Sequence, residues 1–258
     1  MKKKKIIITV IVVILLLAGA VWAMIPRVKI YKIVKEFSDK VFAEEANETC
    51  EYFTDFNVTY APSVQIQTLT YHGITADVPA DWKQKDNGLR AITYMSPDES
   101  ECIIFMEPDD LSFYSLLSEE QIGELMTDLP TKIGTKRIVK GFESLDIGMP
   151  DSGYNTMKAG LLLTQDSCSL FNLEKNIAHY LMCLIKTIGI SGEQHLIYET
   201  DDIHALYHIH PRENDYLSPV YADLFSPDDL NTCHTLIIQI NSYERLYALM
   251  NSVRLESK

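Results

Sequence analysis

An uninterrupted apolar run near the N-terminus constrains this chain more than any other feature. Residues 6–25, IIITVIVVILLLAGAVWAMI, contain no charged side chain. About 20 such residues wound as an α-helix match the hydrocarbon thickness of a bilayer. Inside lipid, a single segment can satisfy its backbone polar groups only as a helix. The run therefore predicts one N-terminal transmembrane helix, preceded by a basic segment at residues 1–5.

A cleaved signal peptide is the competing interpretation of this segment. The basic start, the apolar run up to Leu17, and Val21 and Ala23 as small residues before a cleavage site would fit it. We favour an uncleaved anchor, because the run is longer than the ~7 to 15 apolar residues of a usual signal peptide. Basic residues flank both ends of the run, but the order of basic tail and apolar run favours a single-pass protein of the cell membrane with its C-terminal domain extracytoplasmic.

Composition and charge limit the function classes for the remaining chain. Of 258 residues, 47% are hydrophobic and 23% are charged, which is typical of a globular domain and excludes overall disorder. The formal charge of -13 disfavours DNA or RNA binding, because Lys and Arg contacts to phosphate dominate that affinity. Five cysteines occur without a CxxC pair, so the sequence predicts buried thiols, with one disulfide as the alternative.

The region after the apolar run divides into a connecting segment and a folded body. Residues 26–64 read as a juxtamembrane helix followed by a linker, because apolar residues recur at helical spacing up to Val41 and the periodicity then fades. Residues 65–258 form the expected extracytoplasmic domain. This division implies a single folded domain connected to the anchor by one helix.

The pattern of the body predicts an α+β domain with an antiparallel sheet packed by helices. Strand-like runs alternate with turn residues without regular βαβ spacing. We expect strands at 68–82, 89–97, 101–108, 154–164, 195–200, 203–210 and 235–241. Helices are expected at 118–129, 173–189 and 242–253, the last with Ser242 as its N-cap.

Three stretches resemble the PsbP-like superfamily of extracytoplasmic α+β domains. They are ITADVPADW at 74–82, ITYMSPDESECIIFM at 92–106, and the closing SYERLYALMNSVRLE at 242–256. The resemblance implies an exported or membrane-anchored protein that acts as a binding or assembly partner in the envelope and is seldom an enzyme. It transfers no catalytic residue. Val78, Pro79 and Trp82 are expected to be structural, since burying a tryptophan stabilises a core strongly.

Standard catalytic motifs are missing from the sequence. GxSxG, HExxH, Walker and GxGxxG patterns do not occur. Three acidic clusters lack the ligand spacing of an EF-hand, so solvated loops are preferred over weak calcium sites. These clusters are Asp98, Glu99 and Glu101; Glu107, Asp109 and Asp110; and Asp228 and Asp229.

A histidine-rich stretch, HALYHIHPRE at 204–213, carries the most specific candidate chemistry. Strand parity places Tyr207 on a core-like face and the histidines on the other, expected to be wetter. A tight turn at Asp201 and Asp202 would set Glu199 opposite His204 and His195 opposite His208. One face would then carry His195, Glu199, His204, His208 and His210.

Imidazole and carboxylate are suitable zinc ligands, so this face is a candidate metal site. Protonation near pH 6 is a second reading of the cluster. An ordinary polar sheet face, without a cofactor, is the preferred one. The leading functional hypothesis is accordingly a membrane-anchored binding or assembly module without catalysis. The alternative is a zinc-binding protein or a metal-dependent hydrolase that uses the hairpin at 195–210.

Overall fold

The protein is described by a computed structural model that covers most of the chain. It describes residues 2–44, 48–54, 57–85, 91–114, 126, 129, 134–189, 194–209 and 219–256; within the first range, the side chains of residues 2–15, 17, 20 and 23 are excluded. The expected helix at 118–129 lies almost wholly outside the described residues.

Nine of the described strands form one mixed sheet. Neighbours are antiparallel apart from the parallel pair β1 and β8. The spatial order is β1 (Thr49–Phe53), β8 (Gln194–Glu199), β9 (His204–Ile209), β10 (Val220–Ser226), β11 (Asp229–Gln239), β6 (Cys102–Phe105), β5 (Ile92–Met95) and β4 (Lys83–Lys85), and β7 (Asp109–Asp110) pairs with β11.

A second, antiparallel sheet and a helix cover one face of this large sheet. The second sheet has the order β12 (Arg254–Leu255), β3 (Ile74–Pro79) and β2 (Ile66–Tyr71). Helix α6 (Tyr243–Ser252) begins where the hydroxyl of its N-cap Ser242 accepts a hydrogen bond from the backbone N–H of Arg245. Leu246 and Leu249 of α6 join the main hydrophobic core together with Trp82, which is 3% exposed. The expected cap and the structural role of this tryptophan are confirmed.

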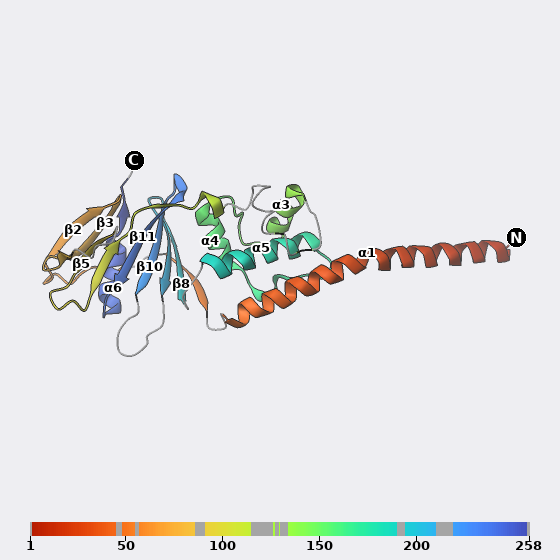
Figure 1. Ribbon diagram of the computed structural model, residues 1–258, viewed down its shortest axis with the longest axis horizontal. Helices are drawn as coiled ribbons and strands as arrows, with labels where there is room; N and C mark the ends of the chain where they lie inside the picture. Colours follow the sequence, from red (N-terminus) through yellow and green to blue (C-terminus); the bar gives the residue numbers. More distant parts are fainter. Residues whose placement is uncertain are drawn as a thin grey trace.

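A helical layer covers the opposite face of the large sheet (Figure 1). It contains α3 (Thr135–Glu143), α4 (Gly153–Leu162), α5 (Leu173–Gly189) and the short 3-10 helices η1 (Ser112–Tyr114) and η2 (Gln165–Ser167). The expectation of a strand at 154–164 is wrong. Tyr154, Met157 and Leu161 recur at helical spacing, and their burial against the sheet stabilises a helix there.

The N-terminal helix α1 (Lys2–Glu44) is continuous and includes Pro26. Its second half packs on the helical layer through Ile30, Val34 and Val41, while its first half projects away from the body (Figure 1). The expected linker at 44–64 contains strand β1, which pairs with β8 and so belongs to the folded body.

In the part of the chain that the structure describes, no helix combines the length and apolar character needed to cross a membrane. Within the expected span at 6–25, the side chains of residues 6–15, 17, 20 and 23 lie outside the described part. An α+β fold with sheets packed by helices is confirmed.

Candidate functional site

The two histidine-bearing strands pair in the register that their spacing predicts. In the antiparallel pair β8 and β9, His195 lies opposite His208 and Glu199 lies opposite His204. The backbone N–H of Thr200 donates to the carbonyl of Ile203 across the turn at 2.9 Å. The fifth candidate ligand, His210, lies outside the described residues.

The half of this face that carries His195 and His208 is buried, which corrects the expectation of a wetter face there, whereas His204 is half-buried and Glu199 is exposed. His195 is fully buried and His208 is 4% exposed. The next pair on this face, Ile197 and Leu206, packs in one buried cluster with Tyr154 of α4. Helices cover this face, while the second sheet and α6 cover the other, so the strands are enclosed on both sides.

The two imidazoles stand in a row of polar side chains that crosses the protein interior. Nδ1 of His195 lies 2.9 Å from Nδ1 of His208, so one ring donates to the other. Nε2 of His195 lies 3.1 Å from Oε1 of Glu48. Nε2 of His208 lies 3.3 Å from Oδ2 of Asp223. We call this row, with Lys186 and Thr235 at its ends, the buried polar chain.

Its two ends hold the carboxylates in place. Nζ of Lys186 lies 2.6 Å from Oε2 of Glu48, and the hydroxyl of Thr235 donates to Oδ1 of Asp223 at 2.8 Å. A cavity of about 460 Å³ borders Glu48 and Lys186, and another of about 160 Å³ borders Asp223 and Thr235. The buried polar chain therefore runs between two cavities and connects α5, the start of β1, and strands β8 to β11.

Burial and neighbouring charges shift the pKa values of His195 and Asp223 in the buried polar chain in opposite directions. Burial lowers the pKa of His195 below its ordinary value, although Glu48 opposes that effect. Burial alone would raise the pKa of Asp223, but the hydrogen bond and charge of His208 hold it below its ordinary value. The arrangement favours a carboxylate at Asp223 and a neutral imidazole at His195.

Glu199 and His204 lie in a separate cluster. Glu199 accepts hydrogen bonds from the hydroxyl of Tyr154 and from Lys158, both at 2.7 Å. The ring of His204 lies 5.0 Å from the ring of Tyr154. Within the described residues, no group of three or more His, Cys, Asp or Glu is arranged to hold a metal ion. Zinc binding by the hairpin stays a prediction.

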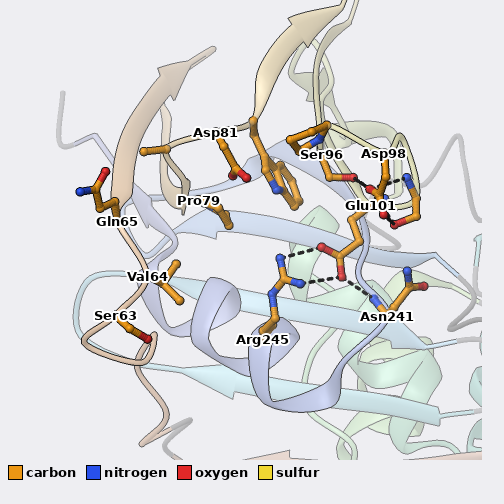
Figure 2. A pocket seen from close by; sticks show the side chains of 14 residues that line it. Ser63, Val64, Gln65, Pro79, Asp81, Ser96, Asp98, Glu101, Asn241 and Arg245 are labelled. Atoms are coloured by element: carbon orange, nitrogen blue, oxygen red, sulfur yellow. Dashed lines mark hydrogen bonds and ion pairs between the residues drawn. The ribbon is translucent and has the colours of Figure 1, made fainter.

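A larger, open cleft lies at the other end of the body, beside the second sheet. It has a volume of about 1080 Å³. Figure 2 shows that residues from the start of β2, the end of β3, the loop after β5 and the start of α6 surround it. Its lining combines apolar groups, such as Val64, Pro79 and Trp82, with the carboxylates of Asp81, Asp98 and Glu101.

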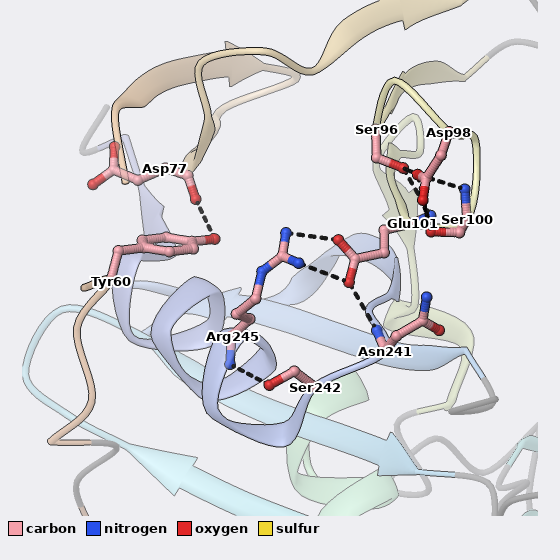
Figure 3. Close-up of polar contacts among 9 residues, drawn as sticks. All are labelled: Tyr60, Asp77, Ser96, Asp98, Ser100, Glu101, Asn241, Ser242 and Arg245. Carbon is pink, nitrogen blue, oxygen red and sulfur yellow. Dashed lines mark hydrogen bonds and ion pairs between the residues drawn. The ribbon is translucent and has the colours of Figure 1, made fainter. Parts of the chain in front are cut away.

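One wall of this cleft is fixed by an ion pair between the buried carboxylate of Glu101 and the partly exposed side chain of Arg245 (Figure 3). Glu101 is 5% exposed, and its carboxylate lies 2.6 Å from Nη2 of Arg245 and accepts the backbone N–H of Asn241 at 3.0 Å. Glu101 is therefore not in a solvated acidic cluster, as its sequence neighbours suggested. The salt bridge neutralises Arg245 locally and attaches the β5–β6 hairpin to α6.

The other carboxylates of the cleft face solvent. Asp98 is exposed and accepts hydrogen bonds from the hydroxyls of Ser96 and Ser100, and the one from Ser96 contributes most to holding its pKa below the ordinary value. Asp81 is exposed, and its side chain points into the cleft in Figure 2. With Arg245 engaged by Glu101, the exposed rim carries a negative charge above an apolar floor.

Sequence reasoning missed the partners that complete both sites. Glu48 fell in the expected linker, and Asp223 lies in β10, which was not expected as a strand. Arg245 and Glu101 are separated by more than a hundred residues. Of these partners, Asp223 alone carried a signal in the sequence, as a charged residue within the apolar run VYADLF at 220–225.

Comparison with known protein families and with curated protein sequences gives no match. None of the models of known protein families matches the chain. No curated protein is similar enough in sequence to count as a match. The resemblance to the PsbP-like superfamily therefore stays a prediction based on the three stretches quoted above.

Proposed function

We propose that this protein is a membrane-tethered binding module, and that its open cleft takes an extended polypeptide segment with basic side chains. The apolar run at 6–25 would serve as a single-pass anchor, with the folded body extracytoplasmic. The partner would be another protein of the envelope. The observation that carries the proposal is the cleft, with its apolar floor and acidic rim, at the end of the folded body far from the projecting half of α1 (Figure 1).

The size and position of the cleft support a polypeptide ligand. A volume of about 1080 Å³ is at the upper end for small-molecule sites, and the open form of the cleft leaves room for an extended segment. The cleft lies beside β2, one edge strand of the second sheet, and its lining residues Asp81 and Trp82 directly precede β4, one edge strand of the large sheet. Edge strands offer unpaired backbone groups, to which an extended segment can add by main-chain hydrogen bonds.

The charge of the rim supports a basic ligand. Asp81 and Asp98 are exposed, and the whole chain carries a formal charge of -13. Carboxylates around an apolar floor suit lysine or arginine side chains, whose apolar stems can cover the floor while their charged ends reach the rim. A basic partner would also be steered toward an acidic body.

Fluorescence anisotropy on the full chain in detergent micelles tests the cleft. The probes are two labelled peptides of equal length that alternate valine with lysine or valine with glutamate. We expect the lysine peptide to bind, and Asp81→Asn to weaken its binding about fivefold, as for loss of one exposed ion pair. Asp228→Asn, in the exposed turn between β10 and β11, is the matched control and should leave the affinity unchanged.

Two results would contradict the proposed ligand. One is equal binding of the lysine and glutamate peptides, and the other is a lysine affinity that Asp81→Asn leaves unchanged. The anchor is tested separately by N-terminal sequencing of membrane and soluble fractions. A mature protein that starts at Met24 in the soluble fraction would show a cleaved signal peptide instead.

A further inference from the structure

We propose that the end of the helical layer from which α1 projects is a second membrane contact, which binds the headgroups of anionic lipids. We call it the membrane-facing end; it comprises Arg27 and Lys29 of α1, Lys136 and Lys140 of α3, and Phe171 before α5. This inference rests on the proposed anchoring of α1. It adds a surface of the folded body that touches the bilayer and so orients the cleft.

The geometry of α1 and α5 sets the height of this end above the bilayer. The two helices run side by side in the same direction, because the rings of Phe37 and Tyr180 have centroids 5.2 Å apart and, farther along both helices, Nζ of Lys186 lies 5.7 Å from the ring centroid of Phe42. Ile30 lies seven residues before Phe37 on α1, and Leu173 lies seven residues before Tyr180 on α5. Ile30 and Leu173 are therefore at the same height along the two helices. The apolar run ends at Ile25, which is about 8 Å farther along α1 at 1.5 Å per residue.

The start of α5, about 8 Å beyond the end of the apolar run, is therefore at the level of the lipid headgroups. The headgroup layer extends roughly 5 to 8 Å beyond the hydrocarbon on each side. Arg27 of α1 lies close to Glu174 at the start of α5. The hydrogen bond from Arg137 contributes most to lowering the pKa of Glu174, and the charge of Arg27 adds to that effect. Figure 1 shows α3 at this same end of the body.

An exposed aromatic ring occupies this position. Phe171 is 74% exposed and directly precedes Asn172, whose side chain accepts the backbone N–H of Lys175 in the first turn of α5. On α1, Trp22 is 78% exposed near the end of the apolar run. Aromatic side chains gather at the interface of bilayers, where an apolar ring meets polar headgroups. Contact with the bilayer interface would cover the exposed ring of Phe171.

The charge of the membrane-facing end is opposite to that of the rest of the body. Residues 27–35 contain four basic and no acidic residues, and α3 contains three basic residues and one acidic, Glu143. Arg27, Lys29, Lys136 and Lys140 are exposed. Residues 190–258, which include half of the large sheet, contain eleven acidic and four basic residues. An anionic surface attracts the first region and repels the second.

The contact is tested with the full chain incorporated into nanodiscs that contain brominated lipid. The measured quantity is the quenching of tryptophan fluorescence by the bromine atoms. The probe is Phe171→Trp in a Trp22→Phe background, where the remaining tryptophan, Trp82, is buried. We expect strong quenching in discs that contain phosphatidylglycerol and at least twofold weaker quenching in pure phosphatidylcholine. Ile66→Trp in the same background is the position control; it lies at the far end on β2 and should not be quenched (Figure 1).

Charge reversal separates lipid binding from mere proximity. Lys136→Glu together with Lys140→Glu should reduce the quenching at least twofold in the anionic discs, whereas Lys83→Glu on β4 should not change it. Unquenched Phe171→Trp in a protein that is incorporated into the discs overturns the membrane-facing end and leaves the anchor intact. Failure of the full chain to incorporate overturns the anchor and, with it, this inference.

Discussion

Nδ1 of His195 and Nδ1 of His208 lie 2.9 Å apart on the helix-covered face of the large sheet. The pair is aligned by the cross-strand register of β8 and β9. Glu48 and Asp223 stand at the outer nitrogens. A polar row of this kind is stable in a core only while its members keep their partners.

Removal of one imidazole should therefore be costly. His208→Leu leaves Nδ1 of His195 and the carboxylate of Asp223 without the ring between them, and we expect it to lower the unfolding free energy by about 3 kcal/mol. Urea denaturation of the full chain in micelles measures this. The His195→Leu and His208→Leu double variant should lose less than the sum of the single variants. Additive losses would contradict the coupling.

Acidification should destabilise the contact between α1 and α5. His179 is fully buried, and burial lowers its pKa to about 4. Because the folded pKa lies below the unfolded value of about 6.5, its stabilising effect is complete above that pH and is lost as the pH falls toward 4. The full loss is roughly 3 kcal/mol. His179→Gln should make the unfolding free energy, measured by urea denaturation, depend less on pH between pH 7 and pH 4.5. An unchanged pH dependence would contradict the role given to His179.

Zinc titration checks the metal hypothesis for the hairpin. We expect no saturable heat when zinc is titrated into the full chain in a calorimeter, because the facing nitrogens of His195 and His208 already share a hydrogen bond. Saturable heat that His204→Ala and His208→Ala abolish would instead support a zinc site there.

The ion pair of Glu101 with Arg245 should contribute more to the unfolding free energy than the exposed ion pair of Glu99 with Lys85. Glu101→Gln removes a charge that Arg245 and Asn241 hold in a buried position, and we expect a loss of about 2 kcal/mol in unfolding free energy. Glu99, two residues earlier, pairs with Lys85 in solvent. Glu99→Gln should change the stability by less than about 0.5 kcal/mol. Equal effects in thermal unfolding would contradict the structural role of Glu101.

The close approach of α3 to α5 needs a glycine. A Cβ at Gly141 would collide with the carbonyl oxygen of Glu174 and lie 2.9 Å from Cβ of Ala178. Gly141→Ala should lower the unfolding free energy by about 3 kcal/mol, because the backbones must separate. At Gly134, the N-cap of the same helix, an added Cβ meets nothing within 4 Å. Gly134→Ala should cost at most about 1 kcal/mol.

Local patterns of the sequence determined several elements of this protein. Strand parity and the two-residue turn were enough to predict which residues of β8 and β9 lie opposite each other. The spacing of apolar residues predicted α5 from Leu173 to Gly189, and a serine before an apolar face predicted the start of α6. These features depend on interactions within a few residues, which a sequence records directly.

The tertiary structure alone decided which faces and partners these elements acquired. The face with His195 and His208 is buried because α4, predicted as a strand, packs over it as a helix. Glu48 and Arg245 reach their partners across long stretches of chain, and Asp223 reaches His208 through the pairing of β9 with β10. Periodicity fixes the direction of a side chain relative to its own strand or helix. Whether that direction meets water, a helix or an opposite charge depends on how distant segments pack, which no local pattern specifies.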